Sequence, residues 1–191
     1  YFVKKALQHG IIPLIYRILS NYSTRVPKRA LNKIRKYFLG NARHTVVLAG
    51  ELVKLLEQFK SLRIPAVPFK GPVMAVVLYG DLSLRQCSDL DILIKEQDVG
   101  SARKLLISEG YYPDPQHQFD FEAHFVHKNK MSVVDLHWGI SFKNIQKYKD
   151  VSFRIDLRGL WERLEPVSFF GKVVWQLSPE DLLMVRCQDA V

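Results

Sequence analysis

Residues 85–94 read RQCSDLDILI, and this stretch indicates which fold the chain adopts. Asp89 and Asp91 stand one residue apart at the start of a short apolar run that is typical of a buried β-strand. Because successive side chains of a strand point to opposite faces, both carboxylates are expected on one face, with Cα atoms roughly 6.6 Å apart. Two such charges repel each other unless a hard divalent cation lies between them. The pair predicts a metal site, although solvated acids at the end of a strand are also common.

The residues before this stretch have the apolar spacing of helices. Residues 2–22 form one such pattern, in which Pro13 either starts a new helix or kinks one. A longer pattern runs from residue 29 to about 63, and Gly40 and Gly50 allow it to be two helices instead of one. The first third of the chain is therefore predicted to be helical.

From residue 64 the pattern changes. Its order is strand, helix, strand, helix, a hairpin of two strands, a short helix, a second hairpin around Gly171, and a helix capped by Ser178. Such an order predicts an α+β fold with a small mixed β-sheet. We expect a helical, basic N-terminal portion over residues 1–62 and an α+β domain over residues 63–191.

The positive charge of the chain is concentrated near its N-terminus. The formal net charge is +9, yet residues 1–50 hold ten Lys or Arg and no Asp or Glu, so the remaining residues are close to neutral. This distribution predicts a surface for nucleic acid, an acidic partner or an anionic membrane, or else a solvated helix face.

The ends of the chain and its two cysteines bear on its location. The chain begins with Tyr1 and ends inside a helical pattern, which suggests a trimmed chain with residues missing at the C-terminus. It contains neither a signal-peptide pattern nor an apolar run of about 18 residues. Cys87 and Cys187 lack the spacing of a metal site and are expected to be free thiols in a reducing compartment. A soluble, cytoplasmic protein without a transmembrane segment is the expectation.

Two further motifs strengthen the prediction of a metal site. In the sequence FKGP, Gly71 forms a turn between a strand and a helix whose free N–H groups suit a phosphate, and Lys70 supplies a positive charge. An ordinary strand-to-helix turn is the alternative. In VVDLHW, Asp135 stands mid-strand on the same face as Val133 and His137. A carboxylate inside a sheet is costly unless it is paired or binds a metal.

These motifs together resemble the nucleotidyltransferases of the DNA polymerase β-like superfamily. The order K-G, R-x-x-x-D-x-D and D-L-H-W is similar to an uncharacterised bacterial branch of that superfamily, over roughly residues 64–185. The resemblance implies that Asp89, Asp91 and Asp135 are catalytic and bind Mg²⁺ or Mn²⁺. It also implies that the turn at Gly71 seats a nucleoside triphosphate such as ATP.

One residue near the motifs differs from the residue that is usual in the superfamily, and another has two possible roles. Pro72 stands where the superfamily usually has Gly or Ser, so one N–H donor to a phosphate is lost. Arg85 and Ser88 lie on the approach to the carboxylates and are assigned to the nucleotide site. Arg85 is expected either to neutralise the triphosphate or to hold the carboxylates through a salt bridge. His137 is expected to be a packed residue rather than a proton carrier.

Two histidines stand on the strand that is predicted before Asp135. His124 and His127 have odd spacing, so they face opposite sides of the sheet and do not form a metal pair with each other.

The leading prediction is a metal-dependent nucleotidyltransferase that moves a nucleoside monophosphate from a nucleoside triphosphate to an acceptor hydroxyl. The acceptor class stays open among small molecules, proteins and RNA. A nucleic acid or an acidic partner remains an option at the basic N-terminal helices. The alternative is a catalytically silent module of the same fold that binds a protein or RNA partner.

Overall fold

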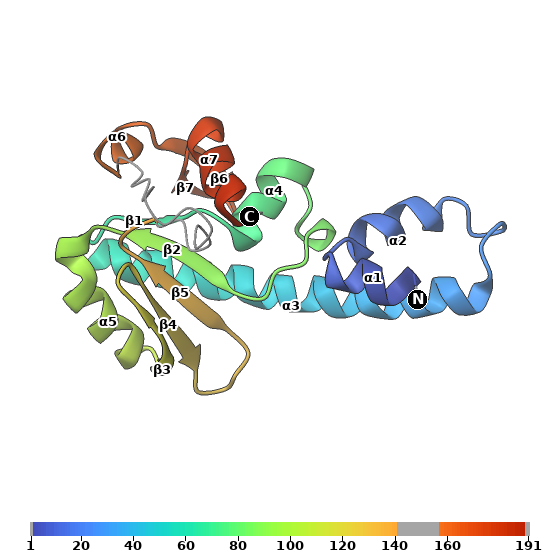
Figure 1. The fold of residues 1–191 in the computed structure, drawn as a ribbon, viewed down its shortest axis with the longest axis horizontal. Helices are drawn as coiled ribbons and strands as arrows, with labels where there is room; N and C mark the ends of the chain where they lie inside the picture. The colour runs from blue at the N-terminus through green and yellow to red at the C-terminus, as the bar shows by residue number, and fades with distance from the viewer. Residues whose placement is uncertain (1, 141–156, 190–191) are drawn as a thin grey trace, which may run out of the picture.

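The computed structural model describes residues 2–140 and 157–189, and it is a mixed α+β fold (Figure 1). Its helices are α1 (Phe2–Gln8), α2 (Ile12–Ser20), α3 (Lys28–Ser61), α4 (Gly71–Tyr79), α5 (Val99–Ser108), α6 (Leu157–Glu162) and α7 (Pro179–Asp189), with 3-10 turns η1 (Leu82–Leu84) and η2 (Glu96–Asp98). Its strands are β1 (Ala66–Pro68), β2 (Leu90–Ile94), β3 (Tyr111–Phe119), β4 (Glu122–His127), β5 (Val133–His137), β6 (Glu165–Phe169) and β7 (Lys172–Gln176). The α+β prediction is confirmed.

Five strands form one mixed sheet in the order β1-β2-β5-β4-β3, and β6 and β7 form a separate hairpin. Strands β2 and β5 are parallel, whereas the other neighbours in the sheet are antiparallel. The parallel pair brings Asp91 directly opposite Asp135. Two carboxylates that are far apart in the chain therefore become neighbours through the register of the sheet.

Helix α3 is one continuous helix of 34 residues, so the alternative of two helices is wrong. Gly40 and Gly50 are exposed on it, and the lost helix propensity of two glycines is small against the packing that holds both halves. The C-terminal half packs under the sheet, whereas the N-terminal half extends beyond it and carries α1 and α2 (Figure 1). Ile34 is buried there with Ala6 and Ile12 in a small separate core.

The main sheet has a hydrophobic core on each face. On one face, α3 and α5 cover β2, β4 and β5 through residues such as Leu52, Phe59 and Leu106. On the other face, Val67 and Leu93 pack with residues of α6 and α7. This second face also has a polar part, which carries the carboxylates of Asp91 and Asp135. None of the helices in the described part of the chain combines the length and apolar composition needed to cross a bilayer.

Most local predictions are confirmed, with one strand missed. Pro13 lies in the first turn of α2, and both predicted hairpins are present as β4–β5 and β6–β7. Ser178 caps α7, because its Oγ accepts a hydrogen bond from the Asp181 N–H at 3.2 Å. Strand β3 was not predicted, since its sequence YYPDPQHQF contains two prolines and little alternation. It forms at the edge of the sheet, where a strand pairs on one side only and fewer of its backbone N–H groups must donate hydrogen bonds. The predicted boundary between a helical N-terminal portion and an α+β domain, at residues 62 and 63, stays a prediction.

The side chain of Asn41 fastens the loop that leads to Asp89 to α3. The amide nitrogen of Asn41 donates hydrogen bonds to the carbonyl oxygens of Ser83 at 3.2 Å and Arg85 at 3.0 Å. These are contacts between segments more than forty residues apart. Asn41 therefore positions the start of β2 relative to the long helix.

We expect Asn41→Leu to lower the free energy of unfolding by about 1–3 kcal/mol, because two partly buried carbonyls lose their donor. Asn32→Leu is the matched control, since Asn32 is exposed on the same helix and its replacement should change stability by less than about 0.5 kcal/mol. Urea denaturation followed by circular dichroism measures both. Equal stability of the two variants would show that the amide does not hold the loop.

Candidate active site

Three carboxylates lie on one face of the sheet, as the sequence pattern predicts. Asp91 is in β2 and is 7% exposed, Asp135 pairs with it in β5, and Asp89 immediately precedes β2. The neighbouring residues Leu90, Val134 and others on the opposite face belong to the main core. The structure therefore brings all three acids together at one end of the parallel strand pair.

The turn at Lys70 and Gly71 lies beside these carboxylates. Gly71 begins α4 with φ +63°, and a Cβ atom at this position would lie 3.1 Å from the carbonyl oxygen of Asp89. A side chain is therefore disfavoured both by the left-handed backbone and by the close approach of the chain. Pro72 is the second residue of α4, so the first turn lacks one N–H donor.

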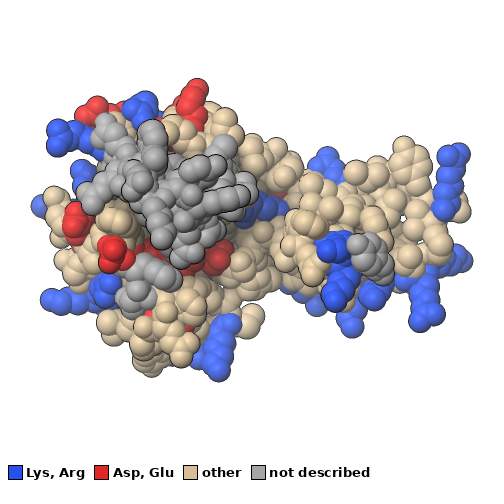
Figure 2. All heavy atoms as spheres, in the orientation of Figure 1, with Lys and Arg blue, Asp and Glu red and all other residues tan. Residues whose placement is uncertain are grey.

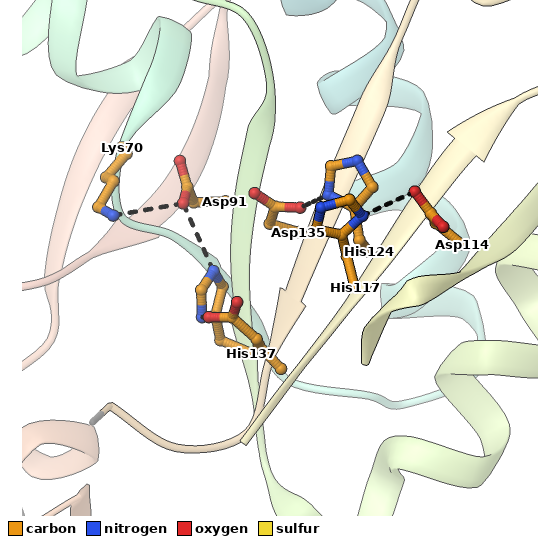
Figure 3. Close-up of polar contacts among 8 residues, drawn as sticks. Lys70, Asp91, Asp114, His117, His124, Asp135 and His137 are labelled. Carbon is orange, nitrogen blue, oxygen red and sulfur yellow. Dashed lines mark hydrogen bonds and ion pairs between the residues drawn. The ribbon is translucent and has the colours of Figure 1, made fainter. Parts of the chain in front are cut away.

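Asp91 is engaged by two cationic or titratable side chains (Figure 3). Its Oδ1 atom is 3.5 Å from Lys70 Nζ and 3.4 Å from His137 Nε2. The other ring nitrogen of His137, Nδ1, is 3.5 Å from Glu122 Oε2, and the ring packs edge-on against Phe69. His137 is thus packed, as predicted, but it also bridges two carboxylates.

Asp135 has a partner that sequence reasoning missed. Its Oδ1 atom forms a hydrogen bond with Nδ1 of His124, which is its direct neighbour in the β4–β5 register (Figure 3). The His124 ring lies 5.5 Å from that of His117, and His117 Nδ1 is 2.9 Å from Asp114 Oδ2. His124 and His127 face opposite sides of the sheet, as predicted. The feature of the sequence that indicated the contact of His124 with Asp135 was their position across the predicted hairpin from each other.

The protonation of the three carboxyl groups differs because their neighbours differ. Burial raises the pKa of Asp89 above its ordinary value, and the charges of Asp91 and Asp135 raise it further. Burial also raises the pKa of Asp135, although His124 opposes this. For Asp91, burial is outweighed by His137 and Lys70, so its pKa is lowered. Mutual repulsion of this kind shows that the three carboxylates are close enough to interact.

The two other predicted nucleotide residues lie in the loop before β2. The Arg85 guanidinium donates to the Gly71 carbonyl oxygen at 3.4 Å and to Cys87 Sγ at 3.3 Å. Within residues 2–140 and 157–189 it forms no ion pair with the three acids. Ser88 is exposed, and a hydrogen bond from it lowers the pKa of Asp89 against the effect of burial. Cys87 is a buried free thiol.

A sequence profile of a known family matches residues 1–190, and the description of that family is "uncharacterised nucleotidyltransferase". The chain belongs to this nucleotidyltransferase family. The family resemblance predicted from the three acidic motifs is therefore confirmed. Because the match begins at the first residues, it includes α1, α2 and α3 as well as the sheet.

A solved structure of another nucleotidyltransferase has a similar fold. It is the lincosamide antibiotic adenylyltransferase LnuA in its lincomycin-bound form, with a TM-score of 0.52 and 18% sequence identity. The similarity covers 71% of this chain and 83% of that one. No curated protein matches the chain. Family and fold together indicate nucleotidyl transfer as the class of chemistry.

The pKa values of Asp89 and Asp91 are shifted in opposite directions, which predicts opposite effects of their replacement on the free energy of unfolding. A raised pKa means that ionised Asp89 destabilises the fold at pH 7, and this cost disappears as the pH falls through that pKa. A lowered pKa means that ionised Asp91 stabilises the fold above its unfolded pKa of about 3.9, and this is lost in acid.

At pH 7 in EDTA, we therefore expect Asp89→Asn to raise the free energy of unfolding and Asp91→Asn to lower it by about 1–3 kcal/mol. Urea denaturation at pH 7 and again near pH 4 measures both effects. The gain from Asp89→Asn should shrink near pH 4, whereas the loss from Asp91→Asn should persist there, because the lowered pKa keeps Asp91 ionised. A change of the same sign in both variants at pH 7 would contradict the assignment of Lys70 and His137 as partners of Asp91.

Proposed function

We propose that this protein is a metal-dependent nucleotidyltransferase that moves a nucleoside monophosphate from a nucleoside triphosphate to an acceptor hydroxyl. The observation that carries the proposal is the direct pairing of Asp91 with Asp135 across parallel strands, with Asp89 and the Lys70–Gly71 turn beside them. An apolar sheet gains no stability from two opposed carboxylates, so their presence favours a function.

The donor set fits magnesium or manganese. All three side chains supply hard carboxylate oxygens, and a divalent ion would relieve the repulsion that raises the pKa of Asp89. No group of three or more potential ligands within the described ranges is already arranged around a common point. Asp89, Asp91 and Asp135 would hold the ion, and Lys70, which contacts Asp91, would supply positive charge to the phosphates. When bound, the metal supplies positive charge that stabilises the transferring phosphate and the leaving pyrophosphate.

The triphosphate is assigned to the first turn of α4. Its backbone N–H groups carry a partial positive charge, and Gly71 allows a phosphate to approach the main chain. Lys70, at the residue before the helix, adds a full charge. Arg85 and Ser88 are assigned to the same ligand, and the contact of Arg85 with the Gly71 carbonyl keeps its guanidinium at this turn.

The acceptor side of the reaction is assigned to Asp135. The acceptor oxygen forms a bond to the α-phosphorus, the bond between that phosphorus and the bridging oxygen breaks, and pyrophosphate leaves. Asp135 accepts the hydroxyl proton, since its raised pKa makes it a better base than a solvated carboxylate. His124 is a positioning residue, because its hydrogen bond fixes one oxygen of Asp135.

Calorimetry with Mg²⁺ and each of the four nucleoside triphosphates tests the proposal. We expect binding that requires the metal, with pyrophosphate release on turnover, and both should be lost when EDTA is added. A catalytically silent module of the same fold is the second candidate, favoured by Pro72 and by the pairing of Asp91 with Lys70. Nucleotide binding without any pyrophosphate release would support that module instead.

Asp135→Asn separates transfer from nucleotide binding. We expect nucleotide affinity to change little, whereas pyrophosphate release falls by about 10²–10⁴-fold, because the variant loses a base needed mainly in the transition state. Asp89→Asn and Asp91→Asn should instead weaken metal-dependent nucleotide binding. The control is Asp120→Asn, which makes the same change at an exposed turn between β3 and β4. Full turnover by Asp135→Asn would remove the third carboxylate from the mechanism.

A further inference from the structure

A cavity of about 660 Å³ lies between the N-terminal helices and the loop that leads to Asp89. We call it the N-terminal groove. One wall is α3, a second is formed by α1 and α2, and the third is the loop residues Gln86, Cys87 and Ser88. Its volume is within the range of small-molecule sites, about 300–1,000 Å³. The groove is thus large enough for a ligand, and its lining extends to Ser88, the residue before Asp89.

The charge of the groove is positive. Lys33 and Lys36 project from α3 into its lining, together with His44 two to three turns further along the same helix face. No acidic residue lines it, and residues 1–50 contain none. Within the described part of the chain, neither lysine forms an ion pair. Figure 2 shows Lys and Arg side chains along the part of the molecule that α1, α2 and the start of α3 form.

One part of the groove lining is apolar. Ile12 and Pro13 are buried and Leu7 is half-buried, so they provide a firm hydrocarbon surface. Tyr37 is 40% exposed and offers a ring for stacking. A site with two unpaired ammonium groups and an apolar floor is complementary to an amphiphilic anion.

Ser88 connects the groove to the carboxylates. It lines the groove, and its side chain forms a hydrogen bond with the adjacent Asp89. Asn41 also lines the groove while holding the carbonyls of Ser83 and Arg85. A ligand in the groove therefore rests on the same loop that presents the proposed metal-binding acids.

From this geometry we propose that the N-terminal groove binds the acceptor, and that the acceptor is a small molecule with an apolar body and a negatively charged group. The inference rests on the proposed function and names its second substrate class. The anionic group pairs with Lys33 and Lys36, the apolar body lies on Ile12 and Pro13, and the hydroxyl points past Ser88 to Asp135. Three walls favour a small molecule over a polymer, and the α4 turn already accounts for the triphosphate.

The probe for the groove is 8-anilinonaphthalene-1-sulfonate, an aromatic anion whose fluorescence rises in an apolar site. We expect Lys33→Ala combined with Lys36→Ala to weaken its binding at least tenfold, and Gly40→Trp to abolish it by filling the groove. The matched control is Lys28→Ala with Arg29→Ala, which removes the same charge from exposed positions of α3 outside the groove. That control should change the affinity for the dye by less than twofold.

The same variants are tested for binding of Mg²⁺-ATP by calorimetry. We expect the affinity of the Lys33 and Lys36 double variant to stay within twofold of the parent. Equal loss of dye binding in the control pair, or no effect of the double variant, would overturn the groove assignment. Loss of Mg²⁺-ATP binding in the double variant would overturn it too, because the groove would then hold the nucleotide. Groove binding without any nucleotide binding would sink the proposed function and leave the anion site standing.

Competition against the dye identifies the anionic group. The competitors are 4-hydroxyphenyl phosphate, 4-hydroxybenzoate and neutral hydroquinone, which share a phenol hydroxyl and differ in charge. We expect displacement by one or both anions at concentrations at least tenfold below that needed for hydroquinone, and mass spectrometry with Mg²⁺-ATP should detect the nucleotidylated phenol. Stronger displacement by a short RNA than by either anion, or equal displacement by hydroquinone, would contradict a small anionic acceptor.

Discussion

The parallel pairing of β2 with β5 is the constraint on which the site depends. It sets Asp91 opposite Asp135 at a spacing that neither segment could establish alone, because 43 residues lie between them in the chain. The cost of placing two buried carboxylates side by side is met by Lys70 and His137 on one and by His124 on the other. Every one of these partners reaches the carboxylates from a different element of the fold.

Helix α3 joins this sheet to the N-terminal helices. Its C-terminal half supplies buried residues such as Leu52 and Phe59 to the main core, and its N-terminal half supports a small second core around Ile34. A single rigid helix thus places the basic surface of the first 50 residues at a fixed distance from the acids. Asn41, near the middle of α3, holds the loop between these two regions.

The electrostatics of the site follow from this arrangement. All charged residues among the first 50 are Lys or Arg, while the sheet presents a cluster of carboxylates. Anionic ligands are attracted by the first region, whereas a divalent cation is favoured by the second. The proposed transfer from a triphosphate to an anionic acceptor would need both fields, because each substrate alone would be repelled by bare carboxylates.

Much of the local structure was predictable from particular residues. The alternation through VVDLHW placed Asp135 and His137 on one face, and Ser178 marked the start of α7. Strand β3 was not predictable from its own sequence, because its prolines disfavour a strand that only the edge of a sheet tolerates. The continuity of α3 was equally hidden, since tertiary packing on both halves outweighs its two glycines.

By itself, the sequence determined the α+β class, the shared face of Asp89 and Asp91, and the concentration of positive charge before residue 50. These depend on periodicity, spacing and composition, which are local properties. Only the tertiary structure decided that His124 contacts Asp135, that Lys70 contacts Asp91, and that the basic helices form a groove beside them. Such contacts depend on strand register and helix packing, which arise from many weak interactions between segments distant in the chain.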